Sequence, residues 1–262
     1  MSRRSEDSAS EARQRISSER TDLAEGAEPE KDLRAVVLCG GLGTRLRSVV
    51  SDRPKSMALI GDVPFLQLLL QNLKDQGVRE AILGTGYRAE QIEDFFQSGK
   101  ELGLQIHYSR EEKPLGTGGA LKLAEELLSD PVLVLNGDSY VEWSLPAMRD
   151  CCREREADIV MVLQEVPDVG RYGSVTMDHG GRVSEFVEKG SRGGAGLINA
   201  GIYLLRKEIV TQLSAGSAIS LERDVFPKFL GKKFYGVVAR GTFIDIGIPA
   251  DLERAQMVLG SV

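Results

Sequence analysis

The chain contains 262 residues, of which 42% are apolar, so it can bury a complete hydrophobic core in one or two domains. Its formal net charge of −6 argues against a general nucleic-acid binder. No apolar run reaches the length of a membrane-spanning helix, and no apolar signal segment follows Met1. The three cysteines, Cys39, Cys151 and Cys152, lack metal-ligand spacing, which favours reduced thiols in a cytoplasmic protein without membrane partners.

The first 32 residues differ in composition from the rest of the chain. They are rich in Ser, Glu and Arg, and beyond Met1 their large apolar side chains are Ile16 and Leu23. Such a segment buries too little apolar surface to offset the entropy of ordering. We therefore expect a disordered N-terminal tail over residues 1–32 and one folded domain over 33–262.

A glycine-rich loop follows the first apolar run. Residues 35–39 are short, continuous and apolar, which is typical of a buried parallel strand. Gly40, Gly41 and Gly43 then allow the backbone to bend sharply and to present N–H groups to an anion. Arg45 and Lys55 add positive charge to the same loop. The pattern predicts a polyphosphate-binding loop.

Short apolar segments alternate with helical patterns from Pro64 to Leu163. We expect strands at 81–83, 104–108, 132–135 and 159–163, and helices from Pro64 and at 90–102, 119–128 and 145–157. This alternation predicts an α/β fold with a mixed, mostly parallel sheet. Ligands bind beyond the carboxyl ends of such strands, where the glycine-rich loop and Asn136-Gly137-Asp138 both fall.

The pattern changes after Val166. Residues 172–177 and 183–187 flank a turn at 178–181, which predicts a β-hairpin. A further strand is expected at 202–205 and a helix start at Ser220. The last strand is expected to end near Gly247, before a final helix that begins at Pro249.

The glycine-rich stretch resembles the signature of sugar-1-phosphate nucleotidyltransferases, Gly-Gly-x-Gly-Thr-Arg-Leu followed by Pro-Lys. The matching residues are Gly40, Gly41, Gly43, Thr44, Arg45, Leu46, Pro54 and Lys55. The family often has a second proline after the lysine, and Ser56 stands there in this chain. The resemblance implies a Rossmann-like three-layer sandwich of the glycosyltransferase-A-like kind, with residues 33–262 as the nucleotidyltransferase catalytic domain.

Two aspartates are candidate metal ligands, Asp138 after an apolar strand and Asp245 near the end of the last one. A carboxylate beside a triphosphate loop would repel the nucleotide unless a cation intervened, and Mg²⁺ typically bridges carboxylates and substrate phosphates. Each aspartate alone is equally consistent with a strand-end turn residue. Together they match the family's Gly-Asp and Asp-x-Gly elements in order, which implies Mg²⁺ as cofactor.

A second group of residues resembles the family's sugar-phosphate signatures. Phe186-Val187-Glu188-Lys189 is similar to Phe-x-Glu-Lys, and Asn199-Ala200-Gly201 is similar to Asn-x-Gly. The resemblance implies that Lys189 holds the acceptor's phosphate, and that Glu188 and Asn199 bind sugar hydroxyls. Gly173 would let the sugar approach the backbone. An exposed Glu-Lys pair at a strand end is the structural alternative.

The string Glu111-Glu112-Lys113-Pro114-Leu115-Gly116-Thr117-Gly118 is the candidate for reading the base. A carboxylate can accept from both N1–H and the 2-amino group of guanine, so Glu111 or Glu112 favours GTP over pyrimidine nucleotides. The string resembles the guanylyltransferase members, especially D-glycero-D-manno-heptose 1-phosphate guanylyltransferases. The resemblance implies that nucleotide binding involves Leu38, Gly40, Gly41, Gly43, Thr44, Glu111 and Gly116.

The expected reaction is an in-line displacement in which the sugar 1-phosphate attacks the nucleotide's α-phosphorus and pyrophosphate leaves. The attacking oxygen is already anionic near pH 7, so catalysis reduces to positioning and charge neutralisation. Arg45, Lys55 and Asp138 are the expected catalytic residues. The partners would be GTP and a sugar 1-phosphate, without nucleic acid or membrane, and a homo-oligomer is compatible with the sequence.

Several alternatives stay open at this point. Residues 84–89 satisfy the dinucleotide fingerprint Gly-x-Gly-x-x-Ala, but a strand-to-helix turn that merely needs small residues is the favoured explanation of this short string. A non-catalytic nucleotide-sugar sensor would usually lack a motif residue, and none of the charged motif residues is missing here. A mannose- or glucose-1-phosphate nucleotidyltransferase would share every motif.

Overall fold

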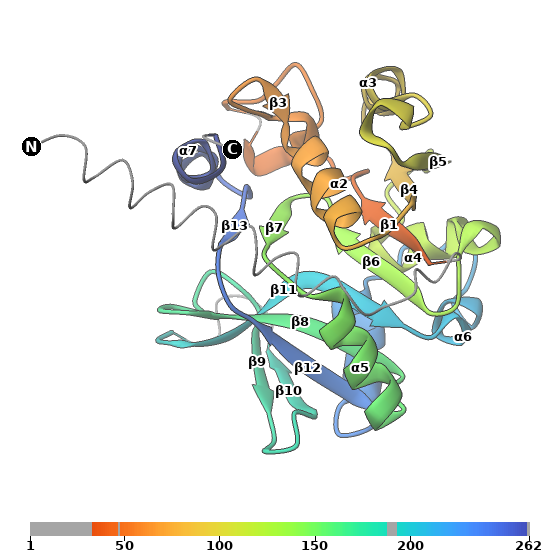
Figure 1. Ribbon diagram of the computed structural model, residues 1–262, viewed down its shortest axis with the longest axis vertical. Helices are drawn as coiled ribbons and strands as arrows, with labels where there is room; N and C mark the ends of the chain where they lie inside the picture. Colours follow the sequence, from red (N-terminus) through yellow and green to blue (C-terminus); the bar gives the residue numbers. More distant parts are fainter. Residues whose placement is uncertain (1–32, 47, 188–192, 261–262) are drawn as a thin grey trace, which may run out of the picture. The chain divides into compact units, whose positions relative to one another are not determined.

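The computed structural model describes residues 33–46, 48–187 and 193–260. Its main feature is a nine-stranded mixed sheet in the order β10-β9-β11-β6-β1-β4-β5, in which β8 pairs with β11 and with β12 (Figure 1). The strands are β1 (Arg34–Leu38), β4 (Glu80–Thr85), β5 (Gln105–Arg110), β6 (Val132–Asn136), β8 (Ile159–Val166), β9 (Ser174–Met177), β10 (Val183–Val187), β11 (Gly196–Leu205) and β12 (Phe234–Ala239).

Helices cover both faces of this sheet. The helices are α2 (Phe65–Asp75), α3 (Ala89–Phe96), α4 (Gly116–Leu123), α5 (Leu145–Arg155), α6 (Lys207–Thr211) and α7 (Pro249–Leu259). Two short ribbons pair β2 (Leu59–Ile60) with β3 (Val63–Pro64) and β7 (Ser139–Val141) with β13 (Phe243–Asp245). The expected α/β architecture with helices on both faces of a mixed sheet is confirmed. None of the described helices is long and apolar enough to cross a membrane.

The central strands are parallel, as expected. β1 pairs in parallel with β4 on one side and with β6 on the other, and β4 pairs in parallel with β5. Their carboxyl ends therefore meet at one edge of the sheet, and the loops that follow β1 and β6 are the glycine-rich loop and Gly137-Asp138. Local sequence thus places the glycine-rich loop beside the candidate metal ligand.

Strand β11 connects this parallel half to an antiparallel half. Its second part pairs with β6, and its first part pairs with the predicted hairpin through β9. The register with β8 shifts between Asn199 and Tyr203, where Gly201 adopts φ +80°. A backbone conformation of this kind suits glycine, so the irregularity is encoded locally.

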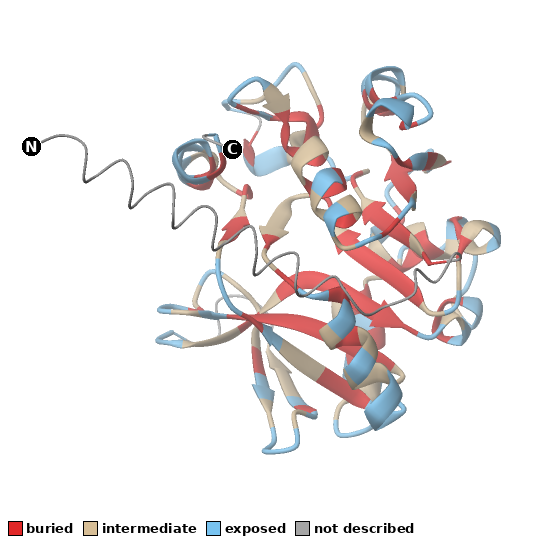
Figure 2. Cartoon of the chain, viewed as in Figure 1, coloured by how far each residue is buried: buried red, intermediate tan, exposed pale blue. Residues whose placement is uncertain are grey.

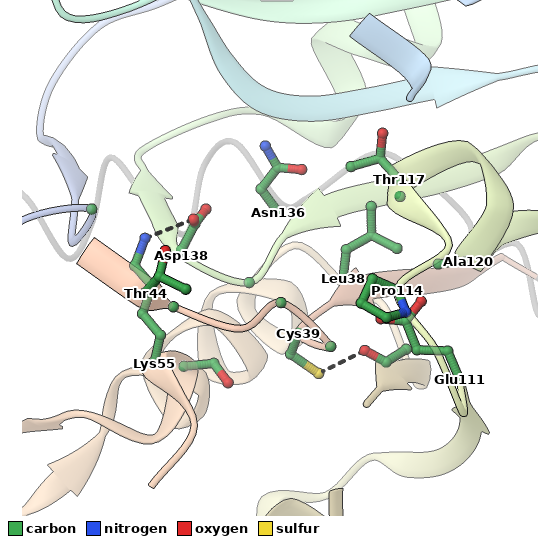
Figure 3. A pocket seen from close by; sticks show the side chains of 18 of the residues that line it. Leu38, Cys39, Thr44, Lys55, Glu111, Pro114, Thr117, Ala120, Asn136 and Asp138 are labelled. Atoms are coloured by element: carbon green, nitrogen blue, oxygen red, sulfur yellow. Dashed lines mark hydrogen bonds and ion pairs between the residues drawn. The ribbon is translucent and has the colours of Figure 1, made fainter. Parts of the chain in front are cut away.

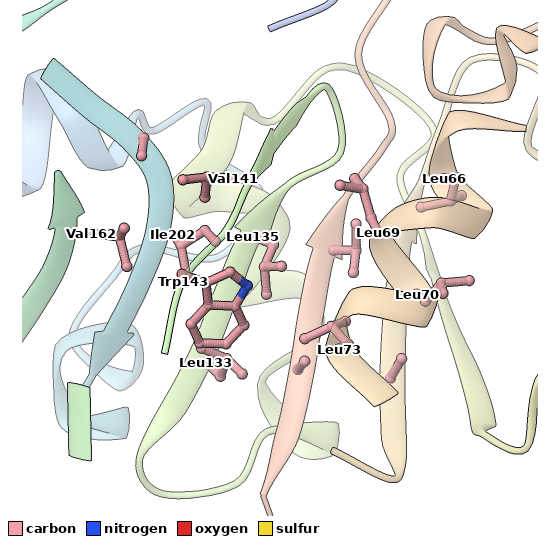
Figure 4. Close-up of a cluster of buried hydrophobic side chains, with 14 of the residues drawn as sticks. Leu66, Leu69, Leu70, Leu73, Leu133, Leu135, Val141, Trp143, Val162 and Ile202 are labelled. Atoms are coloured by element: carbon pink, nitrogen blue, oxygen red, sulfur yellow. The ribbon is translucent and has the colours of Figure 1, made fainter. Parts of the chain in front are cut away.

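The hydrophobic core has two layers because strand side chains alternate between faces. Val37 and Leu135 point into one layer with α2, α5 and α7, whereas Val36 and Val134 point into the other with α4 and α6. Figure 4 shows α2 packing its leucines toward β1, and Figure 2 shows the burial along the sheet. The buried stripe of α2 follows helical spacing: Leu66, Leu69, Leu70 and Leu73. Burial of each such leucine side chain contributes about 1.5–3 kcal/mol to the free energy of folding, relative to leaving it exposed.

Two predicted helices end early in the structure. The helix expected at 119–128 is α4, which ends at Leu123 and is followed by a separate 3₁₀ turn at Glu125–Leu127. The helix expected at 90–102 ends at Phe96, and residues Lys100–Leu102 form a separate 3₁₀ turn. The break lies where Gln97 and Gly99 adopt φ values of +45° and +77°. The chain turns back there so that Ile106 can reach the core from β5. Tertiary packing, rather than helix propensity, sets this boundary.

Candidate active site

A cavity of about 390 Å³ opens at the carboxyl ends of β1 and β6 (Figure 3). Its wall includes every residue that the sequence assigned to catalysis or to the nucleotide, whereas Asp245 lies outside it. The lining residues are Leu38, Cys39, Gly40, Gly41, Gly43, Thr44, Arg45, Lys55, Ser56, Gly84, Glu111, Pro114, Gly116, Thr117, Ala120, Asn136, Gly137, Asp138 and Gly247. The cavity is therefore the best candidate for the nucleotide site.

The glycines of the loop permit close approaches that side chains would block. Gly43 adopts φ +57°, and a Cβ on it would lie 2.9 Å from the Cβ of Lys55. A Cβ on Gly137 would lie 2.7 Å from the carbonyl oxygen of Leu38. Beneath the loop, Cys39 Sγ donates to the carbonyl of Gly84 at 3.3 Å, and burial raises the pKa of this thiol to about 12. Cys39 is thus a packing residue rather than a nucleophile.

Lys55 stands between the two candidate metal ligands. Its Nζ lies 2.8 Å from Asp138 Oδ2 and 3.9 Å from Asp245 Oδ1. The antiparallel pairing of β7 with β13 places Asp245 opposite Ser139, next to Asp138. In addition, the backbone N–H of Gly247 donates to Asp245 Oδ1 at 2.6 Å. Two carboxylates from distant parts of the chain thus converge on one positive charge.

This arrangement fits a divalent cation that is shared with a ligand. The described residues contain no group of three or more His, Cys, Asp or Glu side chains that could enclose a metal ion. Mg²⁺ usually takes only one or two protein carboxylates and completes its shell with water and substrate phosphates. Asp138 and Asp245 therefore suit a magnesium ion that arrives with a nucleotide.

At the other end of the cavity lies Glu111. The backbone N–H of Leu115 donates to Glu111 Oε2 at 3.0 Å, and a Cβ on Gly40 would lie 2.7 Å from Oε1. Burial raises the pKa of Glu111, and the hydrogen bond from Leu115 opposes this shift. The neighbouring Glu112 is exposed and does not line the cavity. Of the two glutamates that the sequence left open, Glu111 is the one placed to meet a base.

Leu115 and the first turn of α4 form backbone hydrogen bonds with a segment about one hundred residues further along the chain. The carbonyl of Ile219 accepts from Gly118 at 2.8 Å, and the N–H of Ile219 donates to the carbonyl of Leu115 at 2.8 Å. Gly116 adopts φ +70°, and a Cβ on it would lie 2.5 Å from the carbonyl oxygen of Ile219. The residue at 116 must therefore be glycine if the two segments are to touch.

A second cavity of about 320 Å³ adjoins the first and shares Arg45 and Gly247 with it. Its other lining residues are Gly170, Arg171, Tyr172, Asp245, Ile248 and Asp251. Asp251, buried in the first turn of α7, forms an ion pair with Arg171. This pair raises the pKa of Arg171, and the charge of Asp245 acts in the same direction. The wall of the second cavity thus combines the guanidinium groups of Arg45 and Arg171 with the carboxylates of Asp245 and Asp251.

The predicted sugar-phosphate residues are only partly described. Gly173 and Asn199 lie together, since the Asn199 N–H donates to the carbonyl of Gly173 at 3.3 Å. Neither residue lines either cavity. The Asn199 carboxamide bonds within the chain, donating to the Tyr203 hydroxyl at 2.8 Å and accepting from the Gly201 N–H at 2.9 Å. Glu188 and Lys189 lie outside the described residues.

Several lining residues are not predicted by the sequence. Asn136 and Thr117 stand inside strings that are singled out for their neighbours, so position in the motif could have flagged them. Arg171 and Asp251 carry no local signal, because only the fold brings α7 against the loop before β9. Ser56, at the departure from the family pattern, also lines the first cavity.

Comparisons with known proteins identify the family of this chain. The family model described as "Nucleotidyl transferase" matches residues 34–261. The chain is 42% identical over 229 residues to the D-glycero-alpha-D-manno-heptose 1-phosphate guanylyltransferase of Aneurinibacillus thermoaerophilus, covering 87% of this chain and 98% of the relative. It is 39% identical to a mannose-1-phosphate guanylyltransferase of Mycobacterium tuberculosis, covering 86% of this chain and 65% of that relative.

Among solved structures, HddC from Yersinia pseudotuberculosis complexed with GMP-PN has a TM-score of 0.78 and 40% sequence identity. The match covers 87% of this chain and 99% of the HddC chain. The resemblance seen in the glycine-rich stretch thus extends over the whole described domain. The chain belongs to the nucleotidyl transferase family.

Proposed function

We propose that this protein transfers GMP from GTP to D-glycero-D-manno-heptose 1-phosphate, with release of pyrophosphate. The position of Glu111 carries the choice of guanine. Its carboxylate stands at one end of the first cavity, and Lys55 with Asp138 stands at the other. A nucleotide laid between them puts its base at a hydrogen-bond acceptor and its phosphates at a cation. The heptose guanylyltransferase relatives support both the nucleotide donor, GTP, and the acceptor, heptose 1-phosphate.

The acceptor assignment rests on two heptose 1-phosphate guanylyltransferases that are 42% and 39% identical to this chain. The mannose-1-phosphate guanylyltransferase from Mycobacterium tuberculosis is also similar, over 86% of this chain. Mannose 1-phosphate is the second candidate, because that relative is still 39% identical. The second cavity, which adjoins the phosphate end of the first, is the proposed acceptor site.

The residues would share the chemistry as follows. Arg45 lines both cavities, so it can contact the phosphates of either substrate and counter the charge of departing pyrophosphate. Lys55 would hold the nucleotide's phosphates, and Lys189 the acceptor's phosphate. Asp138 and Asp245 would hold Mg²⁺, which supplies charge neutralisation at the α-phosphate when bound. Because the acceptor is already anionic, the mechanism requires no general base.

The test is an assay of pyrophosphate release across GTP, ATP, UTP and dTTP, each with heptose, mannose and glucose 1-phosphates. Wild type should prefer GTP. Glu111→Gln should reduce the ratio of kcat/KM for GTP to that for UTP by about tenfold or more, because one carboxylate oxygen that accepts from guanine is lost.

The matched control is Glu112→Gln, which removes an exposed carboxylate one residue away. It should leave the nucleotide preference unchanged. A wild type that prefers a pyrimidine nucleotide, or equal effects of the two substitutions, would show that Glu111 does not read the base.

A further inference from the structure

Two buried side-chain oxygens in the wall of the first cavity, Ser56 Oγ and Asn136 Oδ1, have no hydrogen-bond partner within the described part of the chain. Buried polar atoms of native proteins are nearly always paired, so an exception calls for a partner from outside the chain. Asn136 is the more informative of the two. Its carboxamide has a donor end and an acceptor end, and its neighbours determine which end faces which way.

A group of hydrogen bonds links Glu222 to Thr117, Ser220 and Tyr203. Glu222 sets their direction, because a carboxylate can only accept. Glu222 Oε2 accepts from Thr117 Oγ1 at 2.8 Å and from Ser220 Oγ at 2.7 Å. Thr117 Oγ1 itself accepts from the Leu221 N–H at 2.8 Å, which leaves its hydroxyl hydrogen for Glu222. Glu222 Oε1 accepts from the Tyr203 hydroxyl at 3.2 Å. The single hydrogen of that hydroxyl is thereby committed.

Tyr203 must then act as an acceptor toward its other neighbours. Asn199 Nδ2 donates to its oxygen at 2.8 Å. Burial raises the pKa of Tyr203 well above its ordinary value, while hydrogen bonds from the side chains of Asn199 and Asn136 oppose that shift. Asn136 therefore presents its NH₂ group to Tyr203. Gly201 permits this approach, since a Cβ on it would lie 2.8 Å from Asn136 Nδ2. The carboxamide oxygen is left as the unpaired end.

The place of Asn136 in the cavity indicates what could reach that oxygen. Figure 3 shows its side chain between Asp138 and Thr117, with the oxygen on the side of Thr117. In the proposed binding mode the phosphates lie near Asp138 and the base near Glu111. The part of a nucleotide that joins phosphates to base is the ribose, and its 2′- and 3′-hydroxyls are both hydrogen-bond donors.

We propose that Asn136 Oδ1 accepts a hydrogen bond from a ribose hydroxyl of the bound nucleotide, and that Tyr203 and Glu222 are positioning residues that hold this oxygen in place. The inference rests on the proposed function, because it assumes a guanine nucleotide in the first cavity. It gives Glu222, the buried Tyr203 and Asn136 a shared role in choosing ribonucleotides.

The first experiment measures dissociation constants of GTP, 2′-deoxyGTP and 3′-deoxyGTP by calorimetry with Mg²⁺ present. One deoxynucleotide should bind wild type about tenfold more weakly than GTP, because a buried acceptor loses its donor. In Asn136→Leu that difference should vanish, whereas affinity for the weaker deoxynucleotide should stay close to the wild-type value. Asn136→Ala serves as the second variant if the leucine variant does not fold.

The second experiment tests the positioning residues. Tyr203→Phe removes the acceptor that holds the NH₂ group of Asn136, and Glu222→Gln removes the carboxylate that orients Tyr203. Each substitution should reduce, at least threefold, the ratio of the affinity for GTP to the affinity for the weaker-binding deoxynucleotide. A general loss of stability would not change this ratio. Glu208→Gln, an exchange of the same kind on α6, is the control and should leave the ratio unchanged.

The outcomes separate this inference from the proposed function. If wild type turns over GTP but binds both deoxynucleotides as tightly as GTP, the role of Asn136 is wrong and the transferase assignment stands. The role is also wrong if the preference persists in Asn136→Leu, or if Tyr203→Phe and Glu222→Gln leave the ratio unchanged. A wild type that binds no guanine nucleotide overturns both proposals.

Discussion

Lys55 is the positive charge that lies between the two candidate metal ligands, Asp138 and Asp245. Its ammonium lies within 4 Å of both aspartates, and its side chain is only 12% exposed. A positive charge in this position offsets the repulsion between the carboxylates. The same ammonium is the proposed ligand of the nucleotide's phosphates, and Asp138 and Asp245 are the carboxylates that would hold Mg²⁺ beside it.

Asp138→Asn and Asp245→Asn should therefore each reduce kcat/KM by at least about 10³, since loss of a charged magnesium ligand removes several kcal/mol of transition-state stabilisation. Steady-state rates over a range of Mg²⁺ concentrations, together with melting temperatures, provide the measurement. Asp150→Asn, which removes an exposed carboxylate from α5, is the matched control. Near wild-type activity of either variant at limiting Mg²⁺ would remove that aspartate from the proposed metal site.

At the scale of elements, the contact between the 115–119 turn and the 217–221 segment supports the base end of the cavity. Gly116 and Gly216 both adopt φ +70°. A Cβ on the first would meet the Ile219 carbonyl oxygen at 2.5 Å, whereas a Cβ on the second would meet no described atom within 4 Å. Gly216→Ala thus costs only the backbone strain of a left-handed residue, about 1 kcal/mol.

Gly116→Ala should add to that strain the loss of the contact between the two segments. We expect a larger fall in melting temperature than for Gly216→Ala, and a several-fold rise in KM for GTP that Gly216→Ala does not show. Thermal melts and GTP titrations of both variants provide the measurement. Equal effects of the two substitutions would mean that the contact does not support the nucleotide site.

The same elements show how far the sequence alone can lead. Strand ends are predictable because apolar runs stop at glycine and aspartate, so the residue pattern by itself assigns the glycine-rich loop and Asp138 to one edge of the sheet. Residue chemistry alone does not decide between Glu111 and Glu112; the family resemblance implies Glu111, and in the structure burial distinguishes the two adjacent glutamates. The pairing of Arg171 with Asp251 depends on the docking of α7, which no local pattern records.

At the scale of the whole molecule, the N-terminal 31 residues stand apart by composition. The family match begins at residue 34, and the described domain already spans 98% of the heptose 1-phosphate relative from Aneurinibacillus thermoaerophilus. Deleting residues 1–31 should leave the melting temperature and steady-state kinetics unchanged, because the segment has few apolar side chains to add to a core. A fall of several degrees, or a loss of activity, would contradict this expectation.

The pairing of β8 with β11 also bears on how acceptor preference could be engineered. Val166 at the end of β8 lies opposite Gly196 at the start of β11, so the two ends of the segment 167–195, which contributes β9 and β10 to the same sheet, lie side by side. That segment contains Arg171 and Tyr172 of the second cavity but none of the residues that line the first. Because the two ends of this segment are neighbours, grafting it between relatives would exchange part of the wall of the second cavity, the proposed acceptor site, without replacing any residue that lines the first cavity.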